Sequence, residues 1–138
     1  MRLFQWTTSS SVYLPEIDDE HRGVCKSAAA LYQEIAGSGS IDLKALKTLL
    51  AQVEDHFTHE ERMMRSVRYP SLDWHRKQHD TVRKNIARLM PRIKSGESPA
   101  ALELLEQMSG WLKEHTALAD RMMASYYRNY ARRHPAVA

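Results

Sequence analysis

Histidine and carboxylate residues recur four positions apart on both sides of a helix-breaking dipeptide. His56 and Glu60 precede the Tyr-Pro pair at 69–70, and His75 and His79 follow it. A four-residue spacing places two side chains on one face of a helix, one turn and about 6 Å apart along its axis. Imidazole suits transition metals such as iron, zinc, copper and nickel, and carboxylates add a preference for iron or manganese. This pattern predicts two facing helices that present metal ligands to each other at two heights.

Three more residues of this kind, His21, His115 and Asp120, lie in other parts of the chain. Two residues at one height of an antiparallel helical hairpin have their sequence midpoint in the connecting turn. The midpoint of 21 and 56 is 38.5, inside GSGS at 37–40, and the midpoints of 75 and 79 with 115 are 95 and 97, inside SGESP at 95–99. Across the Tyr-Pro break, His56 with His79 and Glu60 with His75 both have their midpoint at 67.5, in that turn region. The histidines and Glu60 are therefore expected at one level.

Asp120 follows His115 by five residues. At 100° per residue the two side chains diverge by roughly 140° on a regular α-helix. We therefore expect them to flank a wide core face and to reach different sides of a ligand cluster, with Asp120 across from Glu60.

Helical periodicity and the breakers between the periodic segments predict an all-α chain. Ser98 is expected to cap the last helix and Pro99 to occupy its first position. Short connections make neighbouring helices antiparallel, so the architecture is predicted to be an up-down-up-down four-helix bundle. The single domain, 1–138, is expected to comprise an N-terminal arm at 1–17, helices at roughly 18–36, 41–66, 71–93 and 98–131, and a basic tail at 132–138.

Composition excludes several classes of function. The chain has 138 residues, a formal charge of +3 and one cysteine, Cys25, which rules out a multi-cysteine metal site. No run of about 18 apolar residues and no signal-peptide pattern occurs, so we expect a cytoplasmic protein without a membrane partner. The basic segment YYRNYARRHP is interpreted as a solvated helix end, and no nucleic-acid partner is expected. The sequence does not identify a protein partner.

Five histidines and two carboxylates are too many ligands for one metal ion and suit two. If both carboxylates bridge, the histidines divide three and two, which leaves one coordination position open. A small ligand such as dioxygen could bind there. The remaining histidine of this region, His59, is interpreted as a surface or supporting residue, because the other seven residues complete the site.

The segments IDDEH, HFTHEERMM, YPSLDWHRKQH and WLKEHTALAD together resemble the hemerythrin family, especially its bacterial single-domain members. The resemblance runs from Trp6 to about Tyr127. It implies two non-haem iron ions with an oxo or hydroxo bridge, which bind dioxygen reversibly for transport, storage or sensing and not as an enzyme. It further implies that one iron is held by His75, His79 and His115, that the open iron is held by His21 and His56, and that Glu60 and Asp120 bridge the two.

The resemblance also implies an apolar oxygen pocket formed by Val24, Trp111, Leu112 and Thr116. Thr116 departs from the bulky aliphatic residue usual in the family. Its hydroxyl could admit water or hydrogen-bond the bound ligand, or it could bond a backbone carbonyl within its own helix. A wetter pocket would favour the alternative function, a redox enzyme such as a ferroxidase, a peroxidase or a nitric oxide-handling protein. A third hypothesis is a bundle with structural zinc or manganese.

Overall fold

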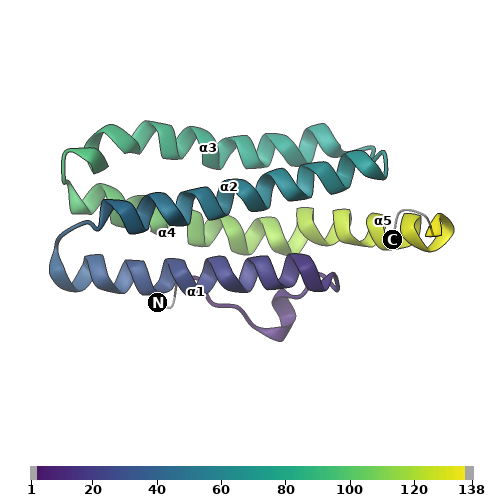
Figure 1. Cartoon of the computed structure of the whole chain (residues 1–138), viewed down its shortest axis with the longest axis horizontal. Helices are drawn as coiled ribbons and strands as arrows, with labels where there is room; N and C mark the ends of the chain where they lie inside the picture. The colour runs from purple at the N-terminus through teal and green to yellow at the C-terminus, as the bar shows by residue number, and fades with distance from the viewer. Residues whose placement is uncertain (1–2, 136–138) are drawn as a thin grey trace.

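The computed structural model describes residues 3–135 and consists of four long helical rods that run alternately up and down (Figure 1). The N-terminal arm crosses beside the first rod, and the fourth rod extends past the others at its C-terminal end (Figure 1). The predicted fold class is therefore confirmed. The elements are η1 (Thr8–Ser10), α1 (Pro15–Ser38), α2 (Leu43–Ser66), α3 (Leu72–Lys94), α4 (Ser98–His115), the π-helical turn η2 (Thr116–Asp120) and α5 (Arg121–Arg133).

Helix ends follow the local sequence, with small differences from the predicted bounds. α1 begins at Pro15, three residues before the predicted start, because proline already has a helical φ and its missing N–H is not needed in the first turn. α1 ends at Ser38 and is followed by Gly39, whose φ of 70° is a left-handed conformation that glycine adopts readily. α2 begins after Asp42, whose carboxylate accepts a 3.0 Å hydrogen bond from the backbone N–H of Ala45.

The fourth rod consists of α4, η2 and α5, and it differs more from its predicted bounds and continuity than the other rods do. Ser98 is the first residue of α4 rather than its cap, which is Glu97, and no side chain there bonds the helix end. The predicted continuous helix at 98–131 is interrupted by the π-helical turn at Thr116–Asp120, after which α5 continues to Arg133. A π-helical turn takes one more residue than an α-helical turn, and such turns are frequent at functional sites.

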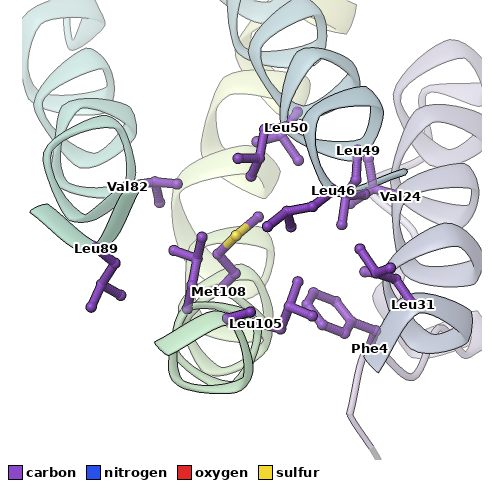
Figure 2. Close-up of a cluster of buried hydrophobic side chains, with 14 of the residues drawn as sticks. Phe4, Val24, Leu31, Leu46, Leu49, Leu50, Val82, Leu89, Leu105 and Met108 are labelled. Carbon is purple, nitrogen blue, oxygen red and sulfur yellow. The ribbon is translucent and has the colours of Figure 1, made fainter. Parts of the chain in front are cut away.

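Two apolar regions enclose a polar layer in the bundle. In the larger core, side chains from all four rods point toward one another (Figure 2). Along α2 this core runs up to Val53 and Phe57, the polar side chains of His56 and Glu60 lie at its end, and Met64 begins a second apolar cluster that includes Met123. The polar layer is thus closed to water by apolar packing at both ends. Within residues 3–135, no helix has the length and apolar content needed to cross a membrane.

Candidate metal centre

The polar layer contains all seven ligand candidates that the sequence identified. Each of these side chains is at most 5 % exposed, although an unpaired buried polar group costs a few kcal/mol. They come from every rod of the bundle: His21 from α1, His56 and Glu60 from α2, His75 and His79 from α3, and His115 and Asp120 from the fourth rod.

Glu60 is the centre of the contacts between α2 and α3. Its Oε1 atom lies 3.1 Å from Nε2 of His79, 3.6 Å from Nε2 of His75 and 3.5 Å from Nε2 of His56. The four-residue spacings on the two helices therefore converge on one carboxylate. This convergence is the arrangement that the midpoint at 67.5 predicted.

Asp120 occupies the corresponding position on the fourth rod. Its Oδ1 atom lies 2.9 Å from Nε2 of His115 and 3.1 Å from Nε2 of His75, and its Oδ2 atom lies 3.1 Å from Nε2 of His21. The expected divergence of roughly 140° between His115 and Asp120 is wrong. The π-helical turn between them brings residues five apart above one another, so the two side chains meet directly.

The seven donors form two overlapping groups in which the potential ligand atoms lie within 4.8 Å of one another. Both groups contain the carboxylates Glu60 and Asp120. One group adds His75, His79 and His115, and the other adds His21 and His56. The three-and-two division that ligand counting gave is therefore present in the geometry, with both carboxylates shared.

Several donors in these groups have no hydrogen-bond partner among residues 3–135. They include Nε2 of His21, His75 and His115, Oε2 of Glu60 and Oδ1 of Asp120. Some lie within contact distance of each other, but their geometry is not that of a hydrogen bond. Buried nitrogen and oxygen atoms that converge without hydrogen-bonding one another can instead coordinate a cation, which satisfies their lone pairs. Imidazole and carboxylate ligands together suit iron. The residues therefore fit a pair of metal ions.

Three of the five histidines are held from behind through their Nδ1 atoms. Nδ1 of His56 lies 2.6 Å from Oε1 of Glu20, and Nδ1 of His79 lies 2.7 Å from Oε2 of Glu61. Nδ1 of His115 lies 2.8 Å from Oε1 of Gln78. An acceptor at Nδ1 makes that atom the protonated one and leaves Nε2 free to bind a metal ion. All five Nε2 atoms point into the layer.

These supporting residues were not found from the sequence, although the same register argument applies to them. The midpoints of 20 with 56, 61 with 79 and 78 with 115 are 38, 70 and 96.5; the first is the last residue of α1, and the other two lie in the connecting segments. His59 belongs to the supporting set as well: its Nδ1 lies 2.6 Å from Oε2 of Glu20. The structure thus places His59 beside the centre and outside both ligand groups, as interpreted from the sequence.

Arg83 fixes the supporting carboxylate of His79. Its guanidinium lies 3.0 Å from Oε2 of Glu61, and it also donates to Glu54 at 2.8 Å and to Asp80 at 3.0 Å. The hydrogen bond to Glu54, together with the other two carboxylates, raises the pKa of Arg83 above its already high value. The cation therefore stays charged and holds Glu61 in place behind the imidazole.

The two shared carboxylates have opposite electrostatic character in the metal-free protein. Burial, reinforced by the negative charge of Asp120, raises the pKa of Glu60 well above its usual range. Burial would also raise the pKa of Asp120, but its contacts with His115, His21 and His75 outweigh that effect and hold it well below the usual range. Burial and the nearby imidazoles lower the pKa of His79 to about 2, so this ligand is neutral.

A small apolar cavity of about 20 Å³ adjoins the two-histidine group. His21 and His56 contribute to its wall, together with Val24, Trp111 and Leu112 of the expected pocket. A cavity of this size holds roughly one water-sized molecule, and its nearly wholly apolar lining offers water few partners. The volume therefore suits a diatomic molecule.

Thr116 does not line this cavity, contrary to the expectation. Its hydroxyl donates to Oδ2 of Asp120 at 3.4 Å, so the alternative of a backbone carbonyl partner is also wrong. Thr116 instead lines a larger surface groove of about 640 Å³ beneath the N-terminal arm, to which His21 and Leu112 also contribute. The hydroxyl thus contacts a shared carboxylate and leaves the cavity apolar.

Two aromatic rings pack flat against histidines of the three-histidine group. Phe57 stacks on His79 with ring centroids 4.1 Å apart and planes inclined by 9°. Trp111 stacks on His115 at 4.2 Å and 15°. Stacking restrains the orientation of both imidazoles in addition to their Nδ1 hydrogen bonds. The contact of Phe57 with His79 was not predicted from the sequence.

A buried layer of five imidazoles and two carboxylates in an antiparallel four-helix bundle defines a metal-binding bundle protein. The sequence model of the family described as the hemerythrin HHE cation binding domain matches residues 13–127. A myohemerythrin from Theromyzon tessulatum is 31 % identical over 117 residues, which cover 85 % of this chain and 88 % of that protein. A bacteriohemerythrin from Ralstonia nicotianae is 26 % identical over 127 residues, 91 % of this chain and 90 % of its own length. The chain belongs to the hemerythrin family, and the resemblance inferred from its motifs is confirmed.

Proposed function

We propose that this protein binds dioxygen reversibly, as a carrier, store or sensor, at a pair of bridged non-haem iron ions held by the seven residues of the polar layer. The observation that carries the proposal is the pair of overlapping ligand groups that share both carboxylates beside a cavity of diatomic size. The names of the relatives, myohemerythrin and bacteriohemerythrin, support the same function.

The residues of the two groups have different roles in this proposal. Glu60 and Asp120 serve both metal ions, and the three-histidine group then provides five protein donors to one of them. With His21 and His56, the other group would provide four protein donors to the second metal ion. That ion would then have more room for an external ligand, on the side of the apolar cavity. When bound, the ferrous pair supplies the electrons with which dioxygen is taken up.

Other residues of the chain keep that chemistry reversible. The apolar walls of the cavity offer water few hydrogen-bond partners, and protons reach a dry site less easily than a wet one. Glu20 and Glu61 hold His56 and His79 in the orientation that points Nε2 inward. Such partners typically change metal affinity 10–100-fold when they are removed.

The enzyme alternative is not favoured. Curated relatives across most of the chain are named as hemerythrins, and the expectation that the protein is not an enzyme agrees with them. The one sequence feature that favoured catalysis was a hydroxyl in the pocket, and Thr116 points to Asp120 instead. A cytoplasmic location and the absence of a nucleic-acid partner stay predictions.

Visible spectroscopy tests the proposal directly. The protein is loaded anaerobically with ferrous iron, and spectra are recorded before oxygen is added, after its addition and after its removal. A charge-transfer band that appears and then disappears is the expected result. Irreversible conversion to a ferric spectrum in the first exposure contradicts reversible binding and supports redox catalysis.

A matched pair of variants tests the ligand set. His56→Ala is expected to lose iron while its helical circular dichroism stays close to that of the parent protein. His59→Ala is the control, because His59 shares Glu20 with His56 but lies outside both ligand groups. Full iron retention by His56→Ala, or equal loss in both variants, would refute the assignment.

A further inference from the structure

Trp111 connects the buried polar layer with the protein surface. Its ring stacks on the imidazole of His115 at 4.2 Å, and the same side chain is only half-buried. It lines a surface pocket of about 430 Å³ between α3 and α4. Phe57 makes the equivalent stack on His79, but it is 2 % exposed and does not reach water. The aromatic ring of Trp111 therefore contacts the ligand candidate His115 and also reaches the solvent-accessible surface pocket.

The surface pocket beside Trp111 is cationic. Lys84 and Arg88 of α3 line it, and no carboxylate does among residues 3–135. The charge of Arg88 is partly compensated, since one of its guanidinium nitrogens lies 3.7 Å from Glu103 of α4, whereas Lys84 is exposed. A hydrogen bond from Asn85 to Gln107 joins the two helices there. A surface of this charge attracts anions and raises their rate of encounter.

We propose that Trp111 is the residue through which electrons reach the metal centre, and that an anionic one-electron donor docks at Lys84 and Arg88 to supply them. The inference rests on the proposed function, because a ferrous pair exposed to dioxygen is eventually oxidised and must be reduced again. Each donor would give up one electron and reduce one ferric ion, so two donors would restore the ferrous pair. One proton from solvent would go to the bridging oxygen and offset one of the two added electrons, so the net charge of the centre would fall by one, and no bond of the protein forms or breaks.

The path through Trp111 reaches the centre at the three-histidine group, although the ring of Trp111 also forms part of the wall of the apolar cavity. His115 belongs to the three-histidine group, whereas the apolar cavity adjoins His21 and His56 of the other group. All seven ligand residues are at most 5 % exposed, so a donor larger than the cavity has no direct contact with them. An aromatic ring in van der Waals contact with a ligand shortens the distance that an electron must cross.

The first experiment uses the metal-free protein and needs no iron chemistry. Trp6→Phe and Trp74→Phe leave Trp111 as the single tryptophan, and its fluorescence is quenched with iodide or with caesium. With each quenching constant divided by that of the same ion for free tryptophan, we expect iodide to quench more strongly than caesium, and Lys84→Glu with Arg88→Glu to reverse that order. The matched control is a charge reversal on α2, Lys44→Glu with Lys47→Glu, which should leave the order of quenching by the two ions unchanged. Equal quenching by both ions, or an equal effect of both double variants, overturns the cationic docking surface.

The second experiment measures reduction of the ferric, iron-loaded protein by stopped flow. The donors are the anionic ferrous complex of ethylenediaminetetraacetate and the cationic hexaammineruthenium(II). Reversal of Lys84 and Arg88 should lower the ratio of the anionic to the cationic rate by about tenfold, and added salt should weaken the effect. A ratio unchanged by the reversal overturns the proposed docking of the donor.

Variants of Trp111 test the path itself. Trp111→Leu should slow reduction by both donors, and Trp111→Phe, which keeps an aromatic ring, should be slowed less. Iron content and circular dichroism establish that each variant is loaded and folded, and equal rates in all three proteins overturn the role of Trp111. If the unmodified protein binds oxygen reversibly and these rates do not change, only the present inference fails. If oxygen binding is absent, the proposed function fails while the fluorescence result still stands.

Discussion

Deleting Leu118 should remove the π-helical turn without removing a ligand from the metal centre. The turn spans Thr116–Asp120 and places His115 and Asp120, five residues apart, at 2.9 Å between Nε2 and Oδ1. Leu118 is 57 % exposed, so its loss takes no buried side chain from the core. After the deletion the same segment can close as a regular α-helix in which the two ligands are four residues apart.

Helix geometry gives the size of the effect. Four residues of α-helix rotate a side chain by about 400°, which leaves it roughly 40° from the first and about 6 Å along the axis. Both donors then stay on the face that carries the metal ligands. A deletion in the regular helix has a different result: removing Glu114 turns everything before it by about 100° and shifts it by about 1.5 Å relative to His115. Either His115 is displaced from the polar layer, or His115 stays and the apolar side chains of α4 are displaced from the core.

Metal content measured after loading and desalting distinguishes these outcomes, with circular dichroism as the check of folding. The Leu118 deletion is expected to hold about two metal ions per chain, the number that seven ligands satisfy. The Glu114 deletion is expected to lose metal, although both residues are exposed and both variants lack one residue. Metal loss in the Leu118 deletion as complete as in the Glu114 deletion would refute the claim that the π-helical turn only adjusts register.

Three further predictions follow from the surroundings of the centre. Glu61→Ala removes the acceptor behind His79 and should weaken iron affinity by about 10–100-fold in a chelator competition, whereas Asp55→Ala, at an exposed position of α2, should not. The free energy of unfolding of the metal-free protein should fall as the pH drops below 6.5, by about 1.4 kcal/mol per pH unit from His79 alone. In this pH range His79 becomes protonated in the unfolded chain, whereas in the folded chain its pKa is about 2 and it stays neutral. The pKa values of two other buried histidines, His56 and His115, are also lowered, whereas the raised pKa values of Glu60 and His21 offset part of the effect. Urea unfolding midpoints at pH 7.5 and 5.5 should therefore differ, and equal midpoints would contradict this. Cys25, whose pKa burial raises to about 11, should react with iodoacetamide at pH 8 only after unfolding, and fast reaction of the folded protein would contradict its burial.

Most of the fold was predictable because each helix carries its own periodic stripe and each turn its own breaker. The heights of the ligands were also predictable, since antiparallel pairing converts sequence midpoints into spatial neighbours. The same arithmetic, applied to Glu20 and Gln78, would have found the partners of His56 and His115. The sequence therefore carries the signal for these supporting residues as well as for the metal ligands.

The π-helical turn is different, because its sequence, TALAD, has no feature that separates it from an ordinary helix. The local dihedral angles at its borders are helical, with φ near −63° and ψ near −42° at Thr116. The extra residue per turn satisfies a tertiary requirement: both His115 and Asp120 must face one layer. A requirement of that kind belongs to the assembled bundle and cannot be read from one helix.

The two halves of the polar layer are restrained to different degrees, and this difference agrees with their proposed roles. In the three-histidine group, His79 and His115 are each held by a hydrogen bond behind and by a stacked aromatic ring. Neither nitrogen of His75 in this group, or of His21 in the other, has a hydrogen-bond partner among residues 3–135. In the other group His56 has an acceptor behind it, but the ring of Phe57 is tilted relative to it and not stacked. A rigid half suits a metal ion whose ligands never change and which must accept electrons with little rearrangement. The less restrained half adjoins the apolar cavity, where an external ligand must come and go.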